Sequence, residues 1–528
     1  MLYVSPIVEA LRGRPRLVFW AAALTQALLW LITPALFYAS PPGEVPLTLA
    51  IGHEWQLGSA YGPPLAYWLG EIAFRLGGLF GVYLLAQVCI VVAFWAVFAL
   101  GQAIVGLSHA VLAILLMAGI ATFAVPSPDF GPSVLALPLT ALTLLHAWRA
   151  IGERQRGAWL WLGLCLGLLN LTTYFGVILL GLIIVFTAAT ERGRGAIMSF
   201  YPAIGLALVA VIALPHLVGL WGGSDAASTY APIAETTAGL LRWLGFLGDL
   251  AIEHAGLLIL MLIAGSFWGD GRAAVPVIER RPVDPFAKQF VYVFALAPAM
   301  LATLVGAARG HTVPLGGQAP LVVLSGLAVI VLAGDLIRLQ RQAIAGWTWF
   351  ALLVGPPILS VLSMVLLPVV FATDVAINTP SRDMGRFFTD SFNRRTGKPL
   401  AVVVGDGRLG GLVALASADR PSLFIDASPQ RAPWVSDADI RDKGAIVVWP
   451  LADAAATIPA HLRGRFPGLV PEVPQTFERP IQGRLPLQRV GWAMIRPQAA
   501  APQSAPPPGA APAEGTPAPA PAAPQPAQ

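Results

Sequence analysis

Long apolar runs dominate the first 372 residues of this 528-residue chain. A helix needs about 20 apolar residues to cross about 30 Å of hydrocarbon, and eleven segments approach or exceed that length. The pattern therefore predicts an α-helical polytopic membrane protein with about eleven transmembrane helices. We expect these spans near residues 16–38, 79–100, 103–124, 131–150, 158–172, 175–190, 198–221, 250–267, 288–308, 318–338 and 346–372.

The pattern changes after the last apolar run. Residues 380–497 carry more charge, and short β-like runs alternate there with helix-compatible segments, which is typical of a small α/β domain. The β-like runs are residues 400–404, 422–425 and 445–449, and the helix-compatible segments include 410–418 and 437–441. Residues 498–528 are mostly Ala, Pro, Gln and Gly, which predicts a disordered tail. We therefore expect a membrane domain over residues 1–379, an α/β domain over 380–497 and a tail over 498–528.

Composition and charge agree with a membrane protein. Only 12% of the residues are charged and 56% are hydrophobic, which excludes most soluble folds. With the N-terminus in the cytoplasm, fourteen Lys and Arg residues before position 373 fall on the cytoplasmic side and three on the other. The net charge of +5 then reflects topology, so we expect no nucleic-acid partner. An odd number of spans places the C-terminal domain on the side opposite the cytoplasm.

The first outer loop, residues 39–78, is far longer than a connection between two helices requires. Residues 63–77 alternate at helical spacing, which predicts a helix in the membrane interface. An acidic and aromatic loop at the membrane surface favours a site that meets a lipid-borne substrate. Its candidate functional residues are Glu44, His53, Glu54, Tyr61 and Arg75.

A second outer loop carries Asp129, which the predicted topology places on the same side as Glu44. Two carboxylates at a lipid surface could act as a general base and as an orienting or metal-binding group. A divalent cation is therefore a candidate cofactor, although each carboxylate could also be an ordinary solvated loop residue. Arg242, Arg309 and His311 lie on the same predicted side, where a basic group could bind a phosphate.

Several motifs resemble family 39-type glycosyltransferases, which include protein O-mannosyltransferases and lipid A aminoarabinose transferases. Glu44 follows the first span and is followed by Tyr61-Gly62-Pro63-Pro64-Leu65, which resembles the first loop of that family. Ser127-Pro128-Asp129 is similar to the family's Thr-Pro-Asp element, and Pro215-His216-Leu217 and Asp284-Pro285-Phe286-Ala287 resemble bacterial members. The resemblance covers roughly residues 10–340.

The resemblance implies a GT-C fold with a catalytic pocket at the outer face. It further implies a polyprenyl-phosphate-linked sugar donor, a lipid, glycan or protein acceptor, and an inverting reaction. Glu44 matches the acidic residue that acts as, or beside, the catalytic base, and Asp129 matches the second-loop acid.

Three departures from the family pattern affect the expected site. Gly43 stands where many members have the Asp of an Asp-Glu pair, Gly62 replaces a basic or polar residue, and a frequent Lys near Thr173 is absent. We therefore expect the leaving phosphate to depend on other groups or on a metal, with Arg309 favoured. The groups considered are His53, Arg75, Arg242, Arg309 and His311.

Two alternatives lack transfer chemistry. The chain could be a carrier or flippase for lipid-linked sugars, or a noncatalytic scaffold whose α/β domain binds a partner. No convincing buried acid relay occurs in the predicted spans, which weighs against a proton-coupled carrier. A degenerate, inactive family member is a further alternative, because the three family positions are altered.

Overall fold

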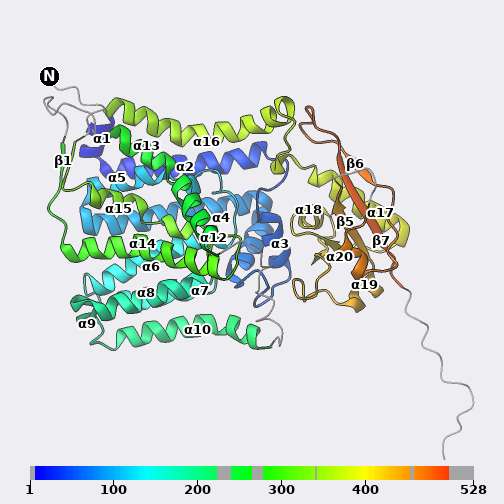
Figure 1. Cartoon of the computed structure of the whole chain (residues 1–528), viewed down its shortest axis with the longest axis horizontal. Helices are drawn as coiled ribbons and strands as arrows, with labels where there is room; N and C mark the ends of the chain where they lie inside the picture. The colour runs from blue at the N-terminus through cyan, green and yellow to red at the C-terminus, as the bar shows by residue number, and fades with distance from the viewer. Residues whose placement is uncertain (1–5, 223–238, 265–276, 339–341, 452–456, 499–528) are drawn as a thin grey trace, which may run out of the picture.

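The computed structural model describes residues 6–222, 239–264, 277–338, 342–451 and 457–498. It consists of a helical bundle and a smaller C-terminal α/β domain packed against one end of it (Figure 1). The expected tail from residue 499 onward lies outside the described residues.

Apolar helices form the bundle, as the sequence predicts. Six of the described helices are long and apolar enough to span a membrane: α2 (Pro15–Phe37), α4 (Leu65–Val105), α6 (Pro132–Ile151), α10 (Tyr201–Gly222), α14 (Pro285–Ala308) and α16 (Gln342–Val370). A bent pair, α12 (Gly239–Glu253) and α13 (Ala255–Ala264), brings the number to seven if it is one span. Shorter apolar helices are α5 (Leu107–Met117), α7 (Ala158–Asn170), α8 (Phe175–Ala189) and α15 (Ser325–Leu332), the last preceded by the 3-10 helix η2 (Ala319–Val322). Every predicted span overlaps one of these elements, so the polytopic α-helical fold class is confirmed.

Two predicted boundaries differ from the structure. The span expected at 250–267 begins earlier, at Gly239, and bends by 48° where α12 meets α13; residues 265–267 lie outside the described residues. The interface helix expected at 63–77 is the first part of α4, which breaks at Gly77 and Gly78 before the span continues. Gly78 has φ +60°, and a Cβ at either glycine would meet no atom within 4 Å. These two glycines therefore allow the backbone to leave the helical conformation; no neighbouring element among the described residues packs closely against them.

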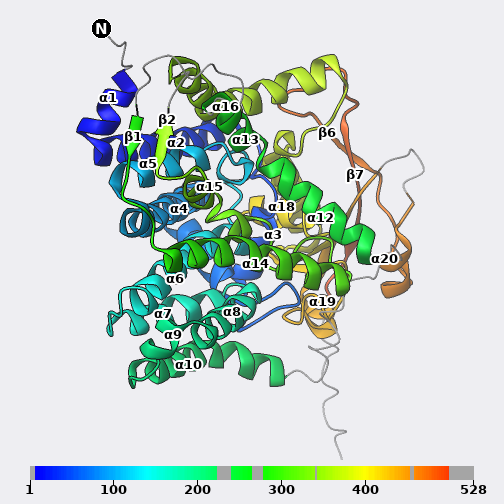
Figure 2. The same cartoon turned by 60° about the vertical axis from the view of Figure 1, so that its left-hand side comes forward.

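A short helix that the sequence pattern did not predict, α3 (Val45–His53), lies between the bundle and the C-terminal domain (Figures 1 and 2). Its nine residues are too few to span a membrane, so the apolar-length criterion does not detect this helix. Pro46 lies in its first turn, where the missing N–H costs no hydrogen bond. Gly52 lies so close to the Tyr67 carbonyl that a Cβ there would be 2.3 Å from the oxygen, which fixes α3 tightly against α4.

The C-terminal domain is built on a five-stranded sheet with the order β4-β3-β5-β7-β6. Its elements are α17 (Ser381–Thr396), β3 (Val402–Gly405), α18 (Leu409–Ala416), β4 (Ser422–Ile425), α19 (Asp437–Lys443), β5 (Ala445–Pro450), α20 (Ala460–Arg465), β6 (Gln475–Phe477) and β7 (Gln488–Ile495). β3 pairs parallel with β4 and β5, whereas β7 pairs antiparallel with β5 and β6. The three predicted strands are confirmed as β3, β4 and β5; β6, β7 and α17 were not predicted.

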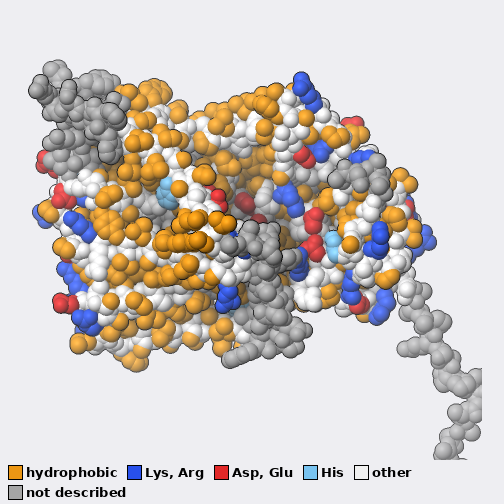
Figure 3. Space-filling model, in the orientation of Figure 1, with side chains coloured by type: hydrophobic (Ala, Val, Ile, Leu, Met, Phe, Trp, Pro, Cys, Tyr) orange, Lys and Arg blue, Asp and Glu red, His pale blue; other side chains and the backbone are white. Residues whose placement is uncertain are grey.

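The end of the bundle away from the C-terminal domain carries α1 (Pro6–Gly13), α9 (Glu191–Ala196) and a two-stranded pairing of β1 (Val277–Glu279) with β2 (Leu336–Arg338). Arg192 pairs there with Asp284, and Arg280 pairs with Asp335. Hydrophobic side chains cover most of the bundle surface between the charged groups at its two ends (Figure 3). That distribution suits a bundle surrounded by lipid.

The junction between bundle and C-terminal domain is a shared core with a buried ion cluster. Ile51 and Tyr67 belong to the same buried apolar cluster as the core of the sheet. Beside them Glu71, only 2% exposed, accepts hydrogen bonds from Arg75 Nε at 2.8 Å and from Arg420 Nη2 at 2.9 Å. Because Arg420 belongs to the C-terminal domain and Glu71 to α4, this ion pair joins the two parts directly.

We predict that Arg420→Ala weakens this junction. The change removes the partner of Glu71 that the C-terminal domain supplies and leaves Arg75 and His53. We therefore expect the free energy of unfolding to fall by about 1.5–3 kcal/mol, the range for a hydrogen bond to a charged group. Thermal unfolding of the full-length protein in detergent, followed by tryptophan fluorescence, should show a lower Tm than wild type. Arg463→Ala, on the exposed face of α20, is the matched control and should leave the Tm unchanged. Equal Tm values for the two variants would contradict this role for Arg420.

Candidate functional site

Asp129 lies at the start of α3, where backbone N–H groups bind its carboxylate. The Glu44 N–H donates to Asp129 Oδ1 at 2.7 Å, and the Val45 N–H also donates to this carboxylate. The first N–H groups of a helix have no partner within the helix, and the helix dipole favours a negative charge there. The two outer loops that carry Glu44 and Asp129, 85 residues apart in the chain, are therefore joined directly.

Gly43 makes this contact sterically feasible. It adopts φ +46°, in the left-handed region, and a Cβ at this position would lie 1.7 Å from Asp129 Oδ2. No side chain fits there unless the Asp129 carboxylate moves. Gly43 stands where many family members have the Asp of an Asp-Glu pair. In this protein the Asp129 carboxylate occupies the space that a side chain at residue 43 would need.

The loop that carries Asp129 is fixed by its own turns. It lies between the short 3-10 helix η1 (Ala121–Phe123) and α6, and the Asp129 N–H donates to the Pro126 carbonyl at 3.0 Å. Gln87 of α4 donates to the Ser127 hydroxyl at 3.3 Å. The carboxylate is thus oriented from both its own loop and the bundle.

Glu44 points toward the first turn of α6. A Cβ at Gly131, the residue before α6, would lie 3.6 Å from Glu44 Oε2 and 3.5 Å from the Thr48 hydroxyl oxygen. The Glu44 side chain remains exposed, and among the described residues its carboxylate has no hydrogen-bond partner. It is therefore the carboxylate of the pair that can meet a substrate.

Both carboxylates have raised pKa values. Burial is the largest cause of the increase in the pKa of Asp129 to about 6; the charge of Glu44 adds to it, while the backbone donors and Arg408 oppose it. The surrounding protein removes enough water from Glu44 to raise its pKa as well, although the side chain keeps solvent access. A carboxylate whose pKa approaches neutrality is suited to general-base chemistry.

Arg408 of the C-terminal domain completes this arrangement. It occupies the position before α18; its Nη1 donates to the Gly43 carbonyl at 2.9 Å, and its Nη2 donates to the Ala376 carbonyl at 2.9 Å. Its charge also interacts favourably with Asp129. The sequence analysis did not identify Arg408, because 365 residues separate it from Gly43 and no local pattern links them.

Three first-loop candidates lie at the other end of α3. His53, Glu54 and Arg75 gather around Glu71 in the domain junction, where His53 Nδ1 is 3.5 Å from Glu71 Oε1. Burial raises the pKa of Glu54, which hydrogen-bonds Ser422 of the C-terminal domain. The nine residues of α3 separate the two groups by about 13 Å. The structure therefore does not bring these three residues together with Glu44 and Asp129.

Tyr61 also lies against the C-terminal domain. Its backbone carbonyl accepts a hydrogen bond from the Tyr67 hydroxyl at 3.1 Å. Burial raises the pKa of the Tyr61 phenol to about 12, with smaller opposing effects of Arg431 and Asp426.

The remaining basic candidates lie on α12 and after α14. Arg242 is half-buried in the first turn of α12, and Arg309 is exposed at the C-terminal end of α14. Burial, with the neighbouring Arg309 charge, lowers the pKa of His311. The loop from Arg309 runs past α6, since a Cβ at Gly317 would lie 2.4 Å from the Ser133 hydroxyl oxygen. This loop thus reaches the same end of α6 as Glu44.

His216 of the Pro215-His216-Leu217 motif holds the first outer loop against α10. Its Nε2 is 3.1 Å from the Tyr174 hydroxyl, and its Nδ1 is 3.2 Å from the Leu57 carbonyl. The contact ties α10 to the middle of the loop between α3 and α4.

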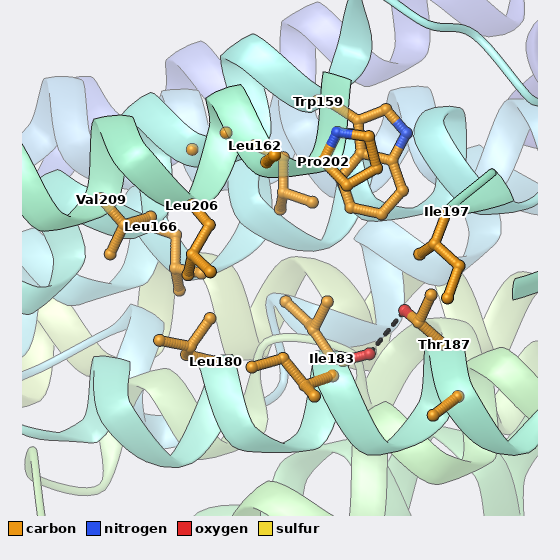
Figure 4. Close-up of a pocket in the computed structure, with 15 residues that line it drawn as sticks. Trp159, Leu162, Leu166, Leu180, Ile183, Thr187, Ile197, Pro202, Leu206 and Val209 are labelled. Carbon is orange, nitrogen blue, oxygen red and sulfur yellow. Dashed lines mark hydrogen bonds between the residues drawn. The ribbon is translucent and has the colours of Figure 1, made fainter. Parts of the chain in front are cut away.

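A separate apolar pocket of about 280 Å³ lies between α7, α8 and α10 (Figure 4). Its lining includes Trp159, Leu180, Ile183 and Leu206, and the hydroxyl of Thr187 is satisfied by the Ile183 carbonyl at 2.6 Å. It holds none of the predicted site residues and lies toward the α9 end of these helices. The pocket is therefore distinct from the carboxylate site.

Glu44 and Asp129 do not form part of a larger ligand set for a metal ion. No group of three or more His, Cys, Asp or Glu side chains placed to hold an ion occurs within the described ranges. In addition, backbone N–H groups already bind the Asp129 carboxylate. The candidate cation predicted from the sequence thus has no preformed site in this part of the chain.

Part of the chain matches one protein family in sequence, and most of the chain is similar in fold to solved structures. Residues 61–219 match the family of dolichyl-phosphate-mannose-protein mannosyltransferases. ArnT from Cupriavidus metallidurans, solved with undecaprenyl phosphate bound, is similar with a TM-score of 0.57 and 13% identity, over 91% of this chain and 97% of that one. The apo oligosaccharyltransferase of Archaeoglobus fulgidus matches with a TM-score of 0.45 and 14% identity, over 84% of this chain and 70% of that one. No curated protein matches the chain in sequence.

The ArnT match shows that the chain has the GT-C fold that the resemblance implied. The family match over residues 61–219, together with this fold, supports a GT-C-type membrane glycosyltransferase. The predicted resemblance is confirmed at that level.

We predict that Gly43→Ala destabilises the site more than a glycine change of equal backbone strain. The left-handed backbone alone costs a non-glycine residue about 1–2 kcal/mol, and here the new Cβ would also displace Asp129. Gly397→Ala is the matched control, because Gly397 has φ +70° but open space around it. Thermal unfolding should show a clearly larger fall in Tm for Gly43→Ala. Similar falls for both variants would show that Asp129 does not press against residue 43.

Proposed function

We propose that the protein transfers a sugar from a polyprenyl-phosphate donor to a hydroxyl group on a lipid, glycan or protein acceptor, with Glu44 as the general base. The observation that carries this proposal is the exposed Glu44 carboxylate beside the half-buried Asp129, at the end of a membrane bundle and at the N-terminus of α6. The GT-C fold supports the donor class, since ArnT was solved with undecaprenyl phosphate bound.

The proposed reaction is a single inverting displacement. Glu44 takes the proton of the acceptor hydroxyl as its oxygen attacks the anomeric carbon of the sugar. The new carbon–oxygen bond forms on the face opposite the phosphate, and the bond to the phosphate oxygen breaks. Polyprenyl phosphate leaves with the bonding electrons, and the proton remains on Glu44 until solvent removes it.

Asp129 has an orienting role in this proposal. Its carboxylate is held by the N–H groups of Glu44 and Val45, so it is not free to accept a proton from a substrate at the same time. It fixes the backbone from which Glu44 projects. A base held in position lowers the entropic cost of reaching the transition state.

The membrane orientation and domain roles belong to the same proposal. Fourteen cytoplasmic basic residues against three on the opposite side favour a site facing away from the cytoplasm. We assign that side to the periplasm of a bacterial inner membrane, because two motifs resemble those of bacterial family members. The membrane domain would then be residues 1–379 and the periplasmic domain residues 380–497. Membrane lipids are partners of the bundle, and nothing in the charge pattern favours nucleic acid.

The leaving phosphate needs positive charge near it, because its charge grows as the glycosidic bond breaks. Arg309 remains our first candidate, since its loop reaches the end of α6 where Glu44 lies. His311 follows it in the same loop, and Arg242 is the second candidate. We do not assign phosphate binding to His53 or Arg75, because both pair with Glu71 in the domain junction. Glu54 and Tyr61 are excluded as well, because they lie against the C-terminal domain.

We predict that Glu44→Gln abolishes transfer and leaves membrane insertion and Tm nearly unchanged. The amide keeps the size of the side chain but cannot accept the hydroxyl proton. Mass spectrometry of envelope glycolipids and glycoproteins, from cells with and without the gene, should reveal the product. That product should return with wild type but not with Glu44→Gln. Glu478→Gln, on the surface of the C-terminal domain, is the control.

Two results would count against the proposal. Full activity of Glu44→Gln would remove Glu44 as the base. An envelope that is identical with and without the gene would favour a carrier or a scaffold.

We further predict that Arg309→Ala lowers turnover by about 10²-fold or more, the loss expected for one charge-stabilising donor. Arg309→Lys should recover part of the activity, because it keeps the charge but not the two-point geometry of the guanidinium. Initial rates in membrane vesicles, at equal protein abundance, measure both effects. A normal rate in Arg309→Ala would move the assignment to Arg242.

A further inference from the structure

The turn that carries Arg408 has a glycine pattern known from nucleotide-binding domains. Gly405-Asp406-Gly407-Arg408-Leu409-Gly410 follows β3 and opens α18, which matches G-x-G-x-x-G between a strand and a helix. Asp426 follows β4, about 20 residues further on, where an acidic residue would bind a ribose. In such domains the helix N-terminus binds a pyrophosphate.

In this protein the ligand position of the turn is already filled. The Asp406 side chain accepts hydrogen bonds from the N–H groups of Arg408 and Leu409, so the chain's own carboxylate takes the place of an anion. Asp426 pairs with Arg431. The usual reading of this motif as a dinucleotide site therefore does not fit.

The glycines instead allow α3 of the bundle to approach the turn. A Cβ at Gly407 would lie 3.3 Å from the Leu47 side chain, and a Cβ at Gly411 would lie 3.2 Å from Pro46. A side chain at either position would press against α3 and require it to shift. The first turn of α3, directly after Glu44, thus packs on the glycine-rich turn of the C-terminal domain.

This contact places Arg408 where three segments meet. Its two donors bind the Gly43 carbonyl and the Ala376 carbonyl, each at 2.9 Å. Ser40 donates its hydroxyl to the same Ala376 carbonyl at 2.9 Å, and its N–H donates to the Ile377 carbonyl at 3.1 Å. The first outer loop, the segment after α16 and the C-terminal domain are thereby locked together beside Glu44.

We propose that the Gly405–Gly411 turn is a docking element that makes Arg408 a positioning residue of the active site, so that the membrane bundle alone is catalytically incomplete. The proposal rests on the function proposed above, because it assigns Arg408 to the Glu44–Asp129 pair. Arg408 acts through that pair: it holds the Gly43 carbonyl and balances the charge of Asp129.

The charges around Asp129 determine the expected pH dependence. The charge of Glu44 disfavours the charged form of Asp129, whereas the charge of Arg408 favours it. Tyr83, an uncharged phenol, also faces Asp129, and Asp374 and Asp406 face Arg408. Loss of the Arg408 charge therefore makes Asp129 harder to ionise. If the ionised pair is the active form, the acidic limb of the rate profile must then move to higher pH.

Three substitutions separate the two effects of Arg408. Turnover and its pH dependence are measured for the full-length protein in membrane vesicles, with the product found by mass spectrometry as the readout. Arg408→Ala should lower turnover by about 10²-fold, as for a misplaced catalytic group, and shift the acidic limb upward by about one pH unit. Arg408→Lys should restore the limb but only part of the rate, and Arg408→Gln should leave the limb shifted.

A second measurement does not depend on transfer. Hydrogen exchange of the backbone N–H groups of residues 43–45, 47 and 48 should be faster in Arg408→Ala than in wild type, because the Gly43 carbonyl loses its hydrogen bond to Arg408. Arg441→Ala, on the exposed face of α19, is the matched control and should leave rate, pH limb and exchange unchanged. If Arg408→Ala does not accumulate, the Lys and Gln variants provide the same comparison.

The outcomes distinguish the two proposals. Inactive Glu44→Gln together with an Arg408→Ala variant that matches Arg441→Ala in rate, pH limb and exchange would overturn the role of Arg408 alone. Active Glu44→Gln would overturn the proposed function. Binding of a dinucleotide such as NAD to the wild-type protein, at a site lost in Gly407→Val, would overturn the assignment of the turn as a docking element.

Discussion

The arrangement of the site depends on one carboxylate bound by backbone N–H groups. Asp129 accepts from Glu44 and Val45 at the start of α3, and this requires a left-handed turn without a side chain at Gly43. The same turn directs Glu44 over the start of α6 and leaves the Gly43 carbonyl free to accept from Arg408. Gly43, which departs from the family pattern, is thus required sterically: a side chain there would collide with the Asp129 carboxylate.

The helix α3 connects the carboxylate site to the domain junction, because each of its ends contacts one of them. One end carries the paired carboxylates, and the other lies beside the Glu71 cluster, where Arg420 of the C-terminal domain is bound. Between them Ile51 packs into the core of the sheet. A displacement of the C-terminal domain would therefore move both ends of α3, so this domain is structurally part of the site.

Sequence reasoning was informative where the signal is local. Apolar length marks the spans, and buried runs mark β3, β4 and β5, because each property depends on neighbouring residues. Glu44 and Asp129 could be assigned to one side of the membrane, and the structure places them in contact. The contacts of Arg408 and Arg420 could not be foreseen, since they join segments hundreds of residues apart. For the same reason, the sequence of the first loop could not show that His53, Glu54 and Arg75 lie in the domain junction, away from Glu44.

The span of 365 residues between Gly43 and Arg408 has a consequence for biosynthesis. The carboxylates are inserted with the first helices, but their cationic partner is translated only after α16, the last long helix of the bundle. The sheet around it closes later still, because β5 pairs with β7, which ends at Ile495. During synthesis and membrane insertion the growing chain therefore exposes an unfinished site to the lipid surface. Completion of the C-terminal fold is therefore the last step in assembly of the site, and a chain truncated before β7 would lack the closed sheet that supports Arg408.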